Sequence, residues 1–116
     1  MSIRLKRVYD APAKSDGRRV LVDRIWPRGL TKREARIDEW LKELAPSAKL
    51  RKWFRHDPDR WKEFKKRYAT ELDDQRENVE QLARASEKRT VTLVFSAKDT
   101  KHNNAVALKE YIERFC

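Results

Sequence analysis

The sequence has little cysteine and no long apolar run, and each deficit excludes a class of protein. The only cysteine among 116 residues is Cys116, so the chain forms no internal disulfide and carries no Cys-x-x-Cys metal or redox motif. No stretch approaches the roughly 18 apolar residues of a membrane-spanning helix, and the first residues lack the apolar core of a signal peptide. We therefore expect a cytoplasmic protein without a membrane partner.

Histidine is also scarce. His56 and His102 do not have the spacing of metal ligands, so no metal site is expected. Charged residues make up 41% of the chain against 39% hydrophobic residues, which indicates a lean core. Disorder is not expected, because the aromatic residues recur at regular spacings and no segment is repeated or of low complexity. The length favours a single α/β domain over residues 1–116.

Positive charge is abundant. The chain holds 29 Lys and Arg against 19 Asp and Glu, a net charge of +10. A potential of this sign attracts phosphorylated metabolites, nucleic acid or anionic membrane surfaces. The same charge also serves solubility, since many charged residues alternate in sign, as in Lys62-Glu63 and Arg76-Glu77. Composition alone leaves these roles open.

Three segments have the pattern of β-strands. Residues 3–9 begin with alternating apolar and basic residues, which is typical of a strand with one buried face. Residues 19–25 and 90–96 are more continuously apolar, which indicates strands buried on both faces. The fold class predicted is α/β: a small, mostly parallel sheet of about three strands flanked by helices on both faces. The second and third strands are expected to be parallel neighbours.

Helical patterns separate these strands. Thr31 and Glu34 form a capping-box pattern, and apolar residues at helical spacing continue it to Leu44, which predicts one helix there. A second predicted helix runs from about residue 59 to residue 86, with a bend near Asp74.

Two shorter helices complete the prediction, one after Ser47 and one opening between Thr100 and Asn104. Apolar residues at these spacings are far more often core than ligand-stacking surfaces. The residues expected to be largely buried are Trp40, Trp53, Trp61, Phe64, Leu93, Phe95, Leu108 and Ile112.

Polar side chains follow the second and third predicted strands. The carboxyl ends of parallel strands line a common crevice in which ligands bind, so side chains from distant parts of the chain should converge there. The helix that begins near Asn103 adds unpaired N–H groups that attract anions. The predicted ligand-binding residues are Arg24, Arg28, Ser96, Lys98, Asp99 and Asn103.

Catalysis at this crevice has three candidates. Ser96 is a potential nucleophile, His102 a general acid or base, and Asp23 the nearby carboxylate. Each residue also has a local explanation: Asp99 in a turn, Asn103 as a helix cap, and His102 as an exposed loop residue. Asp23 equally fits an ion pair without catalysis. The sequence decides neither the reaction nor a cofactor nor the oligomeric state.

One element identifies a family. The run Val22-Asp23-Arg24-Ile25-Trp26-Pro27-Arg28-Gly29, together with matches that extend over nearly the whole chain, resembles the domain of unknown function 488 family in its short, YeaO-like branch. The other matching stretches are residues 6–10, 16–17, 38–40, 47–54 and 93–97, with Phe64, Tyr68, Leu72, Asn103 and Ala105. The family has no agreed activity, so the resemblance implies no reaction.

Longer members of that family resemble this chain in a strand that ends in Val-Asp-x-Arg. They differ in a later strand that ends in cysteine and is followed by Cys-His-Arg. This chain has Ser96 at the strand end and then His102-Asn103-Asn104. The resemblance therefore implies a common crevice, without cysteine chemistry such as rhodanese-like sulfur transfer.

Two functions fit these observations. The first is a site for a small phosphate- or carboxylate-bearing ligand, with or without catalysis. The second is a nucleic-acid-binding module that uses the net positive charge, although the chain has no recognised nucleic-acid motif. Charges gathered in a concave pocket would favour the small ligand, and charges spread over a flat face would favour a polyanion. A third role, a long helix presented to a partner protein, ranks last because its polar stretch offers no apolar patch.

Overall fold

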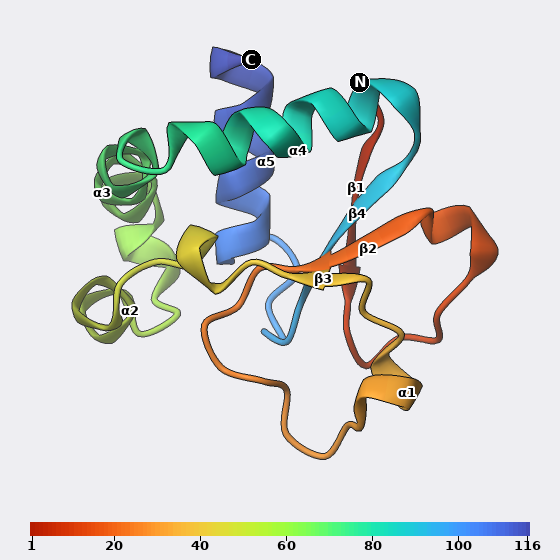
Figure 1. Ribbon diagram of the computed structural model, residues 1–116. Helices are drawn as coiled ribbons and strands as arrows, with labels where there is room; N and C mark the ends of the chain where they lie inside the picture. Colours follow the sequence, from red (N-terminus) through yellow and green to blue (C-terminus); the bar gives the residue numbers. More distant parts are fainter.

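Four parallel strands form one sheet in the computed structural model, which describes residues 1–116 (Figure 1). The strands are β1 (Ile3–Arg7), β2 (Arg18–Leu21), β3 (Glu39–Trp40) and β4 (Val91–Phe95), in the spatial order β1-β4-β2-β3. The helices are α1 (Lys32–Ala35), α2 (Ala48–Phe54), α3 (Trp61–Asp73), α4 (Arg76–Lys88) and α5 (Asn104–Phe115). Short 3₁₀ helices span Lys14–Asp16, Lys42–Leu44 and Pro58–Arg60. The predicted α/β class is confirmed.

Strand β4 is the most buried element of the sheet. All its residues are buried, because it lies between β1 and β2 and is covered on both faces. Val91, Leu93 and Phe95 point into the main core, whereas Val94 points to the opposite face. This alternation follows from the period of two of a strand. The expected parallel pairing of β2 with β4 is confirmed.

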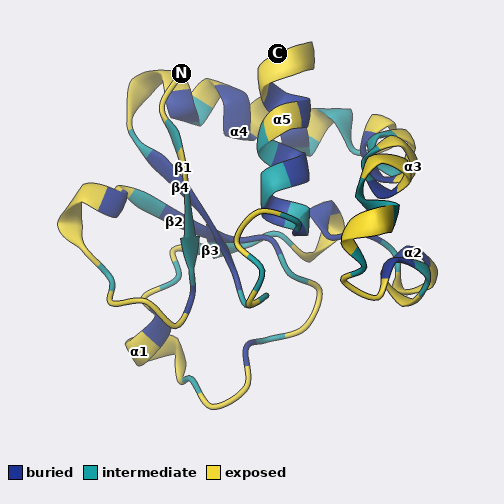
Figure 2. Ribbon diagram, turned by 180° about the vertical axis from the view of Figure 1, so that it is seen from behind, coloured by how far each residue is buried: buried dark blue, intermediate teal, exposed yellow.

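The main core fills the space between one sheet face and the four longer helices. In Figures 1 and 2, α2, α3, α4 and α5 all lie on this side of the sheet, with their buried residues turned towards it. Phe64 and Tyr68 of α3 and Leu108 and Ile112 of α5 are almost completely buried in it. None of these helices is long and apolar enough to cross a membrane.

The second sheet face has a thinner cover, made by α1 and the neighbouring loops. Val8, Leu21, Ala35 and Val94 form a small cluster there. The buried Arg19 anchors α1, because its guanidinium donates to the Ala35 carbonyl at 2.8 Å. One turn of helix therefore suffices to cover this face.

Asp16 is the counter-charge of this buried arginine. Its carboxylate accepts hydrogen bonds from Arg19 at 2.7 Å, from Lys6 at 2.9 Å and from the Ala13 N–H at 2.9 Å. Burial alone would raise the pKa of Asp16, but these donors outweigh it and hold the pKa below its ordinary value. The network joins β1 to β2 across the sheet face that α1 covers.

The prediction of one helix from Thr31 to Leu44 is wrong. The capping box forms as expected, but α1 ends after one turn and Arg36 adopts a left-handed conformation with φ 49°. The chain then pairs with β2, placing Glu39 beside Val20 and Trp40 beside Leu21. Backbone pairing along the free edge of β2 has overridden the helical spacing of the apolar residues.

Two other expected elements are shorter than predicted. The long helix over 59–86 is two helices, because Gln75 leaves helical geometry with φ −118° and ψ 27°. Strand β2 ends at Leu21 rather than at Ile25, whose side chain is 64% exposed.

The predicted burial is confirmed for Phe64, Leu93, Phe95, Leu108 and Ile112. The three tryptophans of that set are partly buried and pack against the edges of the two apolar clusters. Cationic side chains cover their exposed faces: Lys42 lies 4.2 Å from the ring centre of Trp40, Arg67 lies 4.1 Å from that of Trp53, and Lys65 lies 5.4 Å from that of Trp61.

Gly17 lies very close to the backbone of Thr90. It has φ 62° and ψ −130°, a region that is essentially restricted to glycine. A β-carbon there would lie 2.2 Å from the Thr90 carbonyl oxygen. We expect Gly17→Ala to lower the free energy of unfolding by about 2 kcal/mol or more, as measured by urea denaturation.

Gly29 provides the matched control. It also has a positive φ of 82°, but a β-carbon there would meet nothing within 4 Å. Gly29→Ala should therefore cost only about 1 kcal/mol, from the backbone conformation alone. Equal losses for the two variants would contradict the steric explanation.

Candidate functional site

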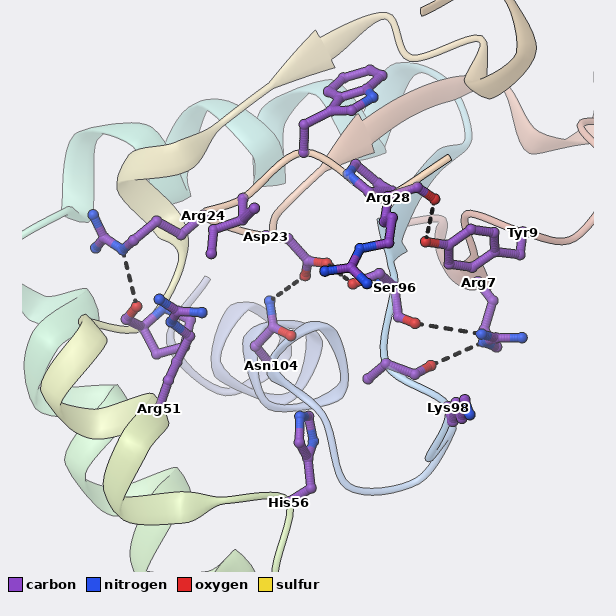
Figure 3. A pocket seen from close by; sticks show the side chains of 15 residues that line it. Arg7, Tyr9, Asp23, Arg24, Arg28, Arg51, His56, Ser96, Lys98 and Asn104 are labelled. Carbon is purple, nitrogen blue, oxygen red and sulfur yellow. Dashed lines mark hydrogen bonds between the residues drawn. The ribbon is translucent and has the colours of Figure 1, made fainter. Parts of the chain in front are cut away.

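A pocket of about 660 Å³ lies at the carboxyl edge of the sheet, where β2 and β4 end beside the first residue of α5 (Figure 3). Its walls come from the end of β1, the loop after β2, the segment around α2, and the loop after β4. Small-molecule sites are usually of this size but mostly apolar. Here most lining side chains are polar or charged, so the pocket suits a polar ligand.

Asp23 occupies the middle of this pocket. One carboxylate oxygen accepts from the Ser96 N–H at 2.9 Å and from the Ser96 hydroxyl at 2.7 Å. The other accepts from the Asn104 amide at 3.1 Å, and the same amide also donates to the Val22 carbonyl at 2.9 Å. The carboxylate thus joins the ends of β2 and β4 to the start of α5.

Basic side chains surround this single carboxylate. Arg24, Arg28, Arg51 and Lys98 are all exposed and line the pocket, and none of them takes part in any of the nine ion pairs of the structure. A fifth cation, Arg7, donates to the backbone carbonyls of Ala97 at 2.9 Å and Ser96 at 3.4 Å. The pocket therefore carries an excess of positive charge.

Hydrogen bonds to the backbone hold the loop after β2 in place. The Tyr9 hydroxyl donates to the Arg28 carbonyl at 2.9 Å, and the indole of Trp26 donates to the Leu30 carbonyl at 2.7 Å. Trp26 also packs edge-on against Trp40, with ring centres 5.4 Å apart. Every peptide bond of the chain is trans. The backbone of Arg28 is fixed in this way while its guanidinium has no partner within the chain.

Residues 2–115 match the family model described as the inactive DUF488-N3 subclade. The chain belongs to this family. It is 42% identical over 112 residues to the uncharacterized protein YeaO of Escherichia coli, covering 97% of each chain. It is 39% identical over 110 residues to the uncharacterized protein Rv3073c of Mycobacterium tuberculosis, covering 95% of this chain and 92% of that protein. No solved structure matches the chain significantly. The resemblance inferred from the sequence is confirmed.

The structure brings most of the predicted site residues of this DUF488-N3 protein together. Arg24, Arg28, Ser96 and Lys98 all line the pocket, and so does Asp23. Asp23 and Ser96 thus lie at the same edge of the sheet, as the parallel pairing of β2 with β4 requires. Asp99 and Asn103, the other two predicted ligand-binding residues, do not line it.

Asp99 and Asn103 make local hydrogen bonds instead. One Asp99 oxygen accepts from the N–H groups of Lys101 and His102, and the other contacts the His102 ring at 2.9 Å. Asn103 is buried and caps α5 by accepting from the Val106 N–H at 3.0 Å. These bonds shape the loop between β4 and α5, and so set where Ser96 and Lys98 lie.

The three catalytic candidates do not form one constellation. The Ser96 hydroxyl donates to Asp23, whereas His102 contacts Asp99 and packs edge-on against Trp61, with ring centres 5.4 Å apart. His102 does not line the pocket. The structure contains no group of three or more His, Cys, Asp or Glu that could hold a metal ion.

The lining residues that the sequence did not predict include Arg7, Tyr9, Arg51, His56 and Asn104. Arg7 ends β1, which is itself parallel to β4, so the strand-end rule could have found it. Arg51 and His56 carry no such signal, since α2 reaches the pocket only through tertiary packing. Arg55 and His56 are consecutive left-handed residues, with φ 53° and φ 54°. The usual sequence signal of this conformation is glycine, and neither residue is one.

The loop after β4 should respond to acid through Asp99. The N–H of Lys101, the His102 ring and the His102 N–H lower the pKa of Asp99 from 3.8 to about 2. Because the folded pKa lies below the unfolded one, the stabilisation is complete above pH 3.8 and is lost as the pH falls to about 2. A carboxyl titration by NMR should give the low midpoint, and His102→Ala should raise it. An ordinary midpoint in the parent protein would contradict the geometry of this loop.

Proposed function

We propose that the pocket at the ends of β2 and β4 binds a small anionic ligand that carries a phosphate or a carboxylate. The observation that carries this proposal is the convergence of Arg24, Arg28, Arg51 and Lys98 on one concave site in which they have no anionic partner. Arginine and lysine bind phosphate and carboxylate through short, charge-assisted hydrogen bonds. The net charge of +10 would draw such ligands towards the protein.

The energetics of the ligand-free pocket support a binding role. Like charges held close together repel one another, so this arrangement contributes no stability by itself. Asp23 offsets part of the repulsion, but its oxygens already accept from Ser96 and Asn104. A bound anion would supply the missing negative charge, which is a reason for four cations to face one cavity.

Binding is favoured over turnover. The family to which the chain belongs is described as an inactive subclade. Ser96 makes no hydrogen bond to a histidine. Its hydroxyl donates to the carboxylate of Asp23, and carboxylates are weak bases. We therefore propose a ligand-binding protein rather than an enzyme.

Binding of nucleic acid, the second candidate, would use a broader surface. Single strands are usually held by bases stacked on exposed aromatic rings. The exposed faces of Trp40, Trp53 and Trp61 are instead covered by lysine and arginine side chains. The positive potential still acts on any polyanion, so the experiment includes an oligonucleotide.

Arg28→Ala and Lys98→Ala should weaken the binding of inorganic phosphate. Loss of one charge-assisted hydrogen bond is worth about 1.5–3 kcal/mol, so we expect roughly a tenfold or greater rise in Kd by calorimetry at low salt. The melting temperature of each ligand-free variant should stay constant or rise, because one of several like charges has been removed.

Arg84→Ala is the matched control. It removes the same charge from α4, away from the pocket, and Arg84 has no hydrogen bond or ion pair through its side chain. It should leave phosphate binding nearly unchanged. The proposal fails if the parent protein responds to no phosphate, sulfate or nucleotide while the pocket variants lose stability. Tight binding of an oligonucleotide that Arg28→Ala and Arg84→Ala weaken equally would support the nucleic-acid function instead.

A further inference from the structure

The pocket is divided into two cationic walls. In Figure 3, Arg24 and Arg51 lie together on one side of Asp23, the side chain of Arg28 extends towards Asp23 from the other side, and Lys98 lies farther away on that side. The first wall combines the loop after β2 with α2, and the Arg24 guanidinium donates to the Pro46 carbonyl at 3.4 Å. The second wall combines the same loop with the segment after β4. The positive charge is therefore distributed over two places.

The side chains of Asp23, Ser96 and Asn104 offer hydrogen-bond acceptors and no free donor. The single hydroxyl proton of Ser96 is directed to Asp23, so towards a ligand the oxygen can only accept. The Asn104 amide group donates to Val22 and to Asp23, which uses both of its hydrogens. The available atoms are the oxygens of Asp23, Ser96 and Asn104. An anionic group placed there would be repelled, whereas an O–H or N–H would find a partner.

We propose that the ligand carries two anionic groups joined by a short linker that bears a hydroxyl or amine. One anionic group binds between Arg24 and Arg51, and the other binds beside Arg28 and Lys98. The donor on the linker faces Asp23 and Ser96. Sugar bisphosphates and phosphorylated hydroxy acids belong to this chemical class. The inference rests on the proposed function and specifies the kind of ligand that the same pocket selects.

The size of the pocket agrees with such a ligand. A cavity of about 660 Å³ is far larger than one phosphate requires and lies within the range of sites for small metabolites. Two anionic groups on one molecule also bind with a high effective concentration, because the second group is already near its site once the first is bound. A ligand with both groups should therefore bind much more tightly than one with a single group.

Calorimetry with four probes tests this inference. Glycerol phosphate has one anionic group and hydroxyls, phosphoglycerate has two anionic groups and a hydroxyl, and its deoxy analogue lacks only that hydroxyl. Fructose bisphosphate has two phosphates at a greater separation. We expect at least one of phosphoglycerate and fructose bisphosphate to bind about tenfold or more tightly than glycerol phosphate. Where phosphoglycerate binds more tightly than fructose bisphosphate, the deoxy analogue should bind about threefold or more weakly than phosphoglycerate, because it lacks the hydroxyl that donates to the pocket.

Arg51→Ala separates the two walls. It should remove the advantage of the two-anion ligand while changing the Kd of glycerol phosphate less than about threefold. A single phosphate is expected beside Arg28 and Lys98, whose cationic groups have no partner within the chain, because the Arg24 guanidinium already donates to the Pro46 carbonyl. Arg24→Ala should act in the same way and serves as the second variant of that wall. Arg84→Ala lowers the net charge equally and should preserve the ratio of the two affinities, which excludes a general effect of charge.

Two outcomes overturn the inference and leave the proposed function in place. In the first, glycerol phosphate binds in an Arg28-dependent manner but neither two-anion ligand binds more tightly. In the second, Arg51→Ala weakens all probes by the same factor, which would indicate one undivided anion site. If no probe binds the parent protein, the proposed function fails and the inference fails with it.

Discussion

The hydrogen bonds that Asp23 accepts from Ser96 and Asn104 determine the shape of the pocket. They join the ends of two neighbouring strands to the start of α5. A carboxylate is well suited to this position because it accepts several hydrogen bonds at once. Its negative charge also lowers the potential produced by the surrounding arginines. The same carboxylate thus positions the ends of β2 and β4 and reduces the repulsion among the cations of the pocket.

The ion pairs elsewhere in the molecule have local physical reasons. The buried Arg19 is paired with Asp16 and also bonded to the Ala35 carbonyl, because an unpaired charge in that place would be very costly. On the surface, pairs such as Arg67 with Glu63 follow helical spacing. Most lysines and arginines of the chain lie outside these ion pairs, and those of the pocket differ in that they line one concave site together. Gathering like charges in this way opposes local stabilisation. Departures of this kind from local stabilisation are expected at functional sites.

The agreement between sequence and structure depends on the range of the interactions involved. The pattern of β4 was recognised because all its residues are buried, so its composition alone identifies a central strand. The caps at Thr31, Ser47 and Asn103 were found because each acts on residues within the next turn. The predicted helix up to Leu44 failed because β3 exists only through its pairing with β2. The helical propensity of a short segment carries no information about its pairing with a distant strand.

The sequence by itself determined the central strands, the helix caps, the family and the residues that follow β2 and β4. These features depend on local periodicity or on a rule that applies to every parallel sheet. Only the tertiary structure decided that Arg51 and His56 reach the pocket, because α2 is placed there by packing against α3 and not by its own sequence. It also decided that Asp99 turns away towards Lys101 and His102, since the nearby N–H groups satisfy its carboxylate more closely than a distant strand could.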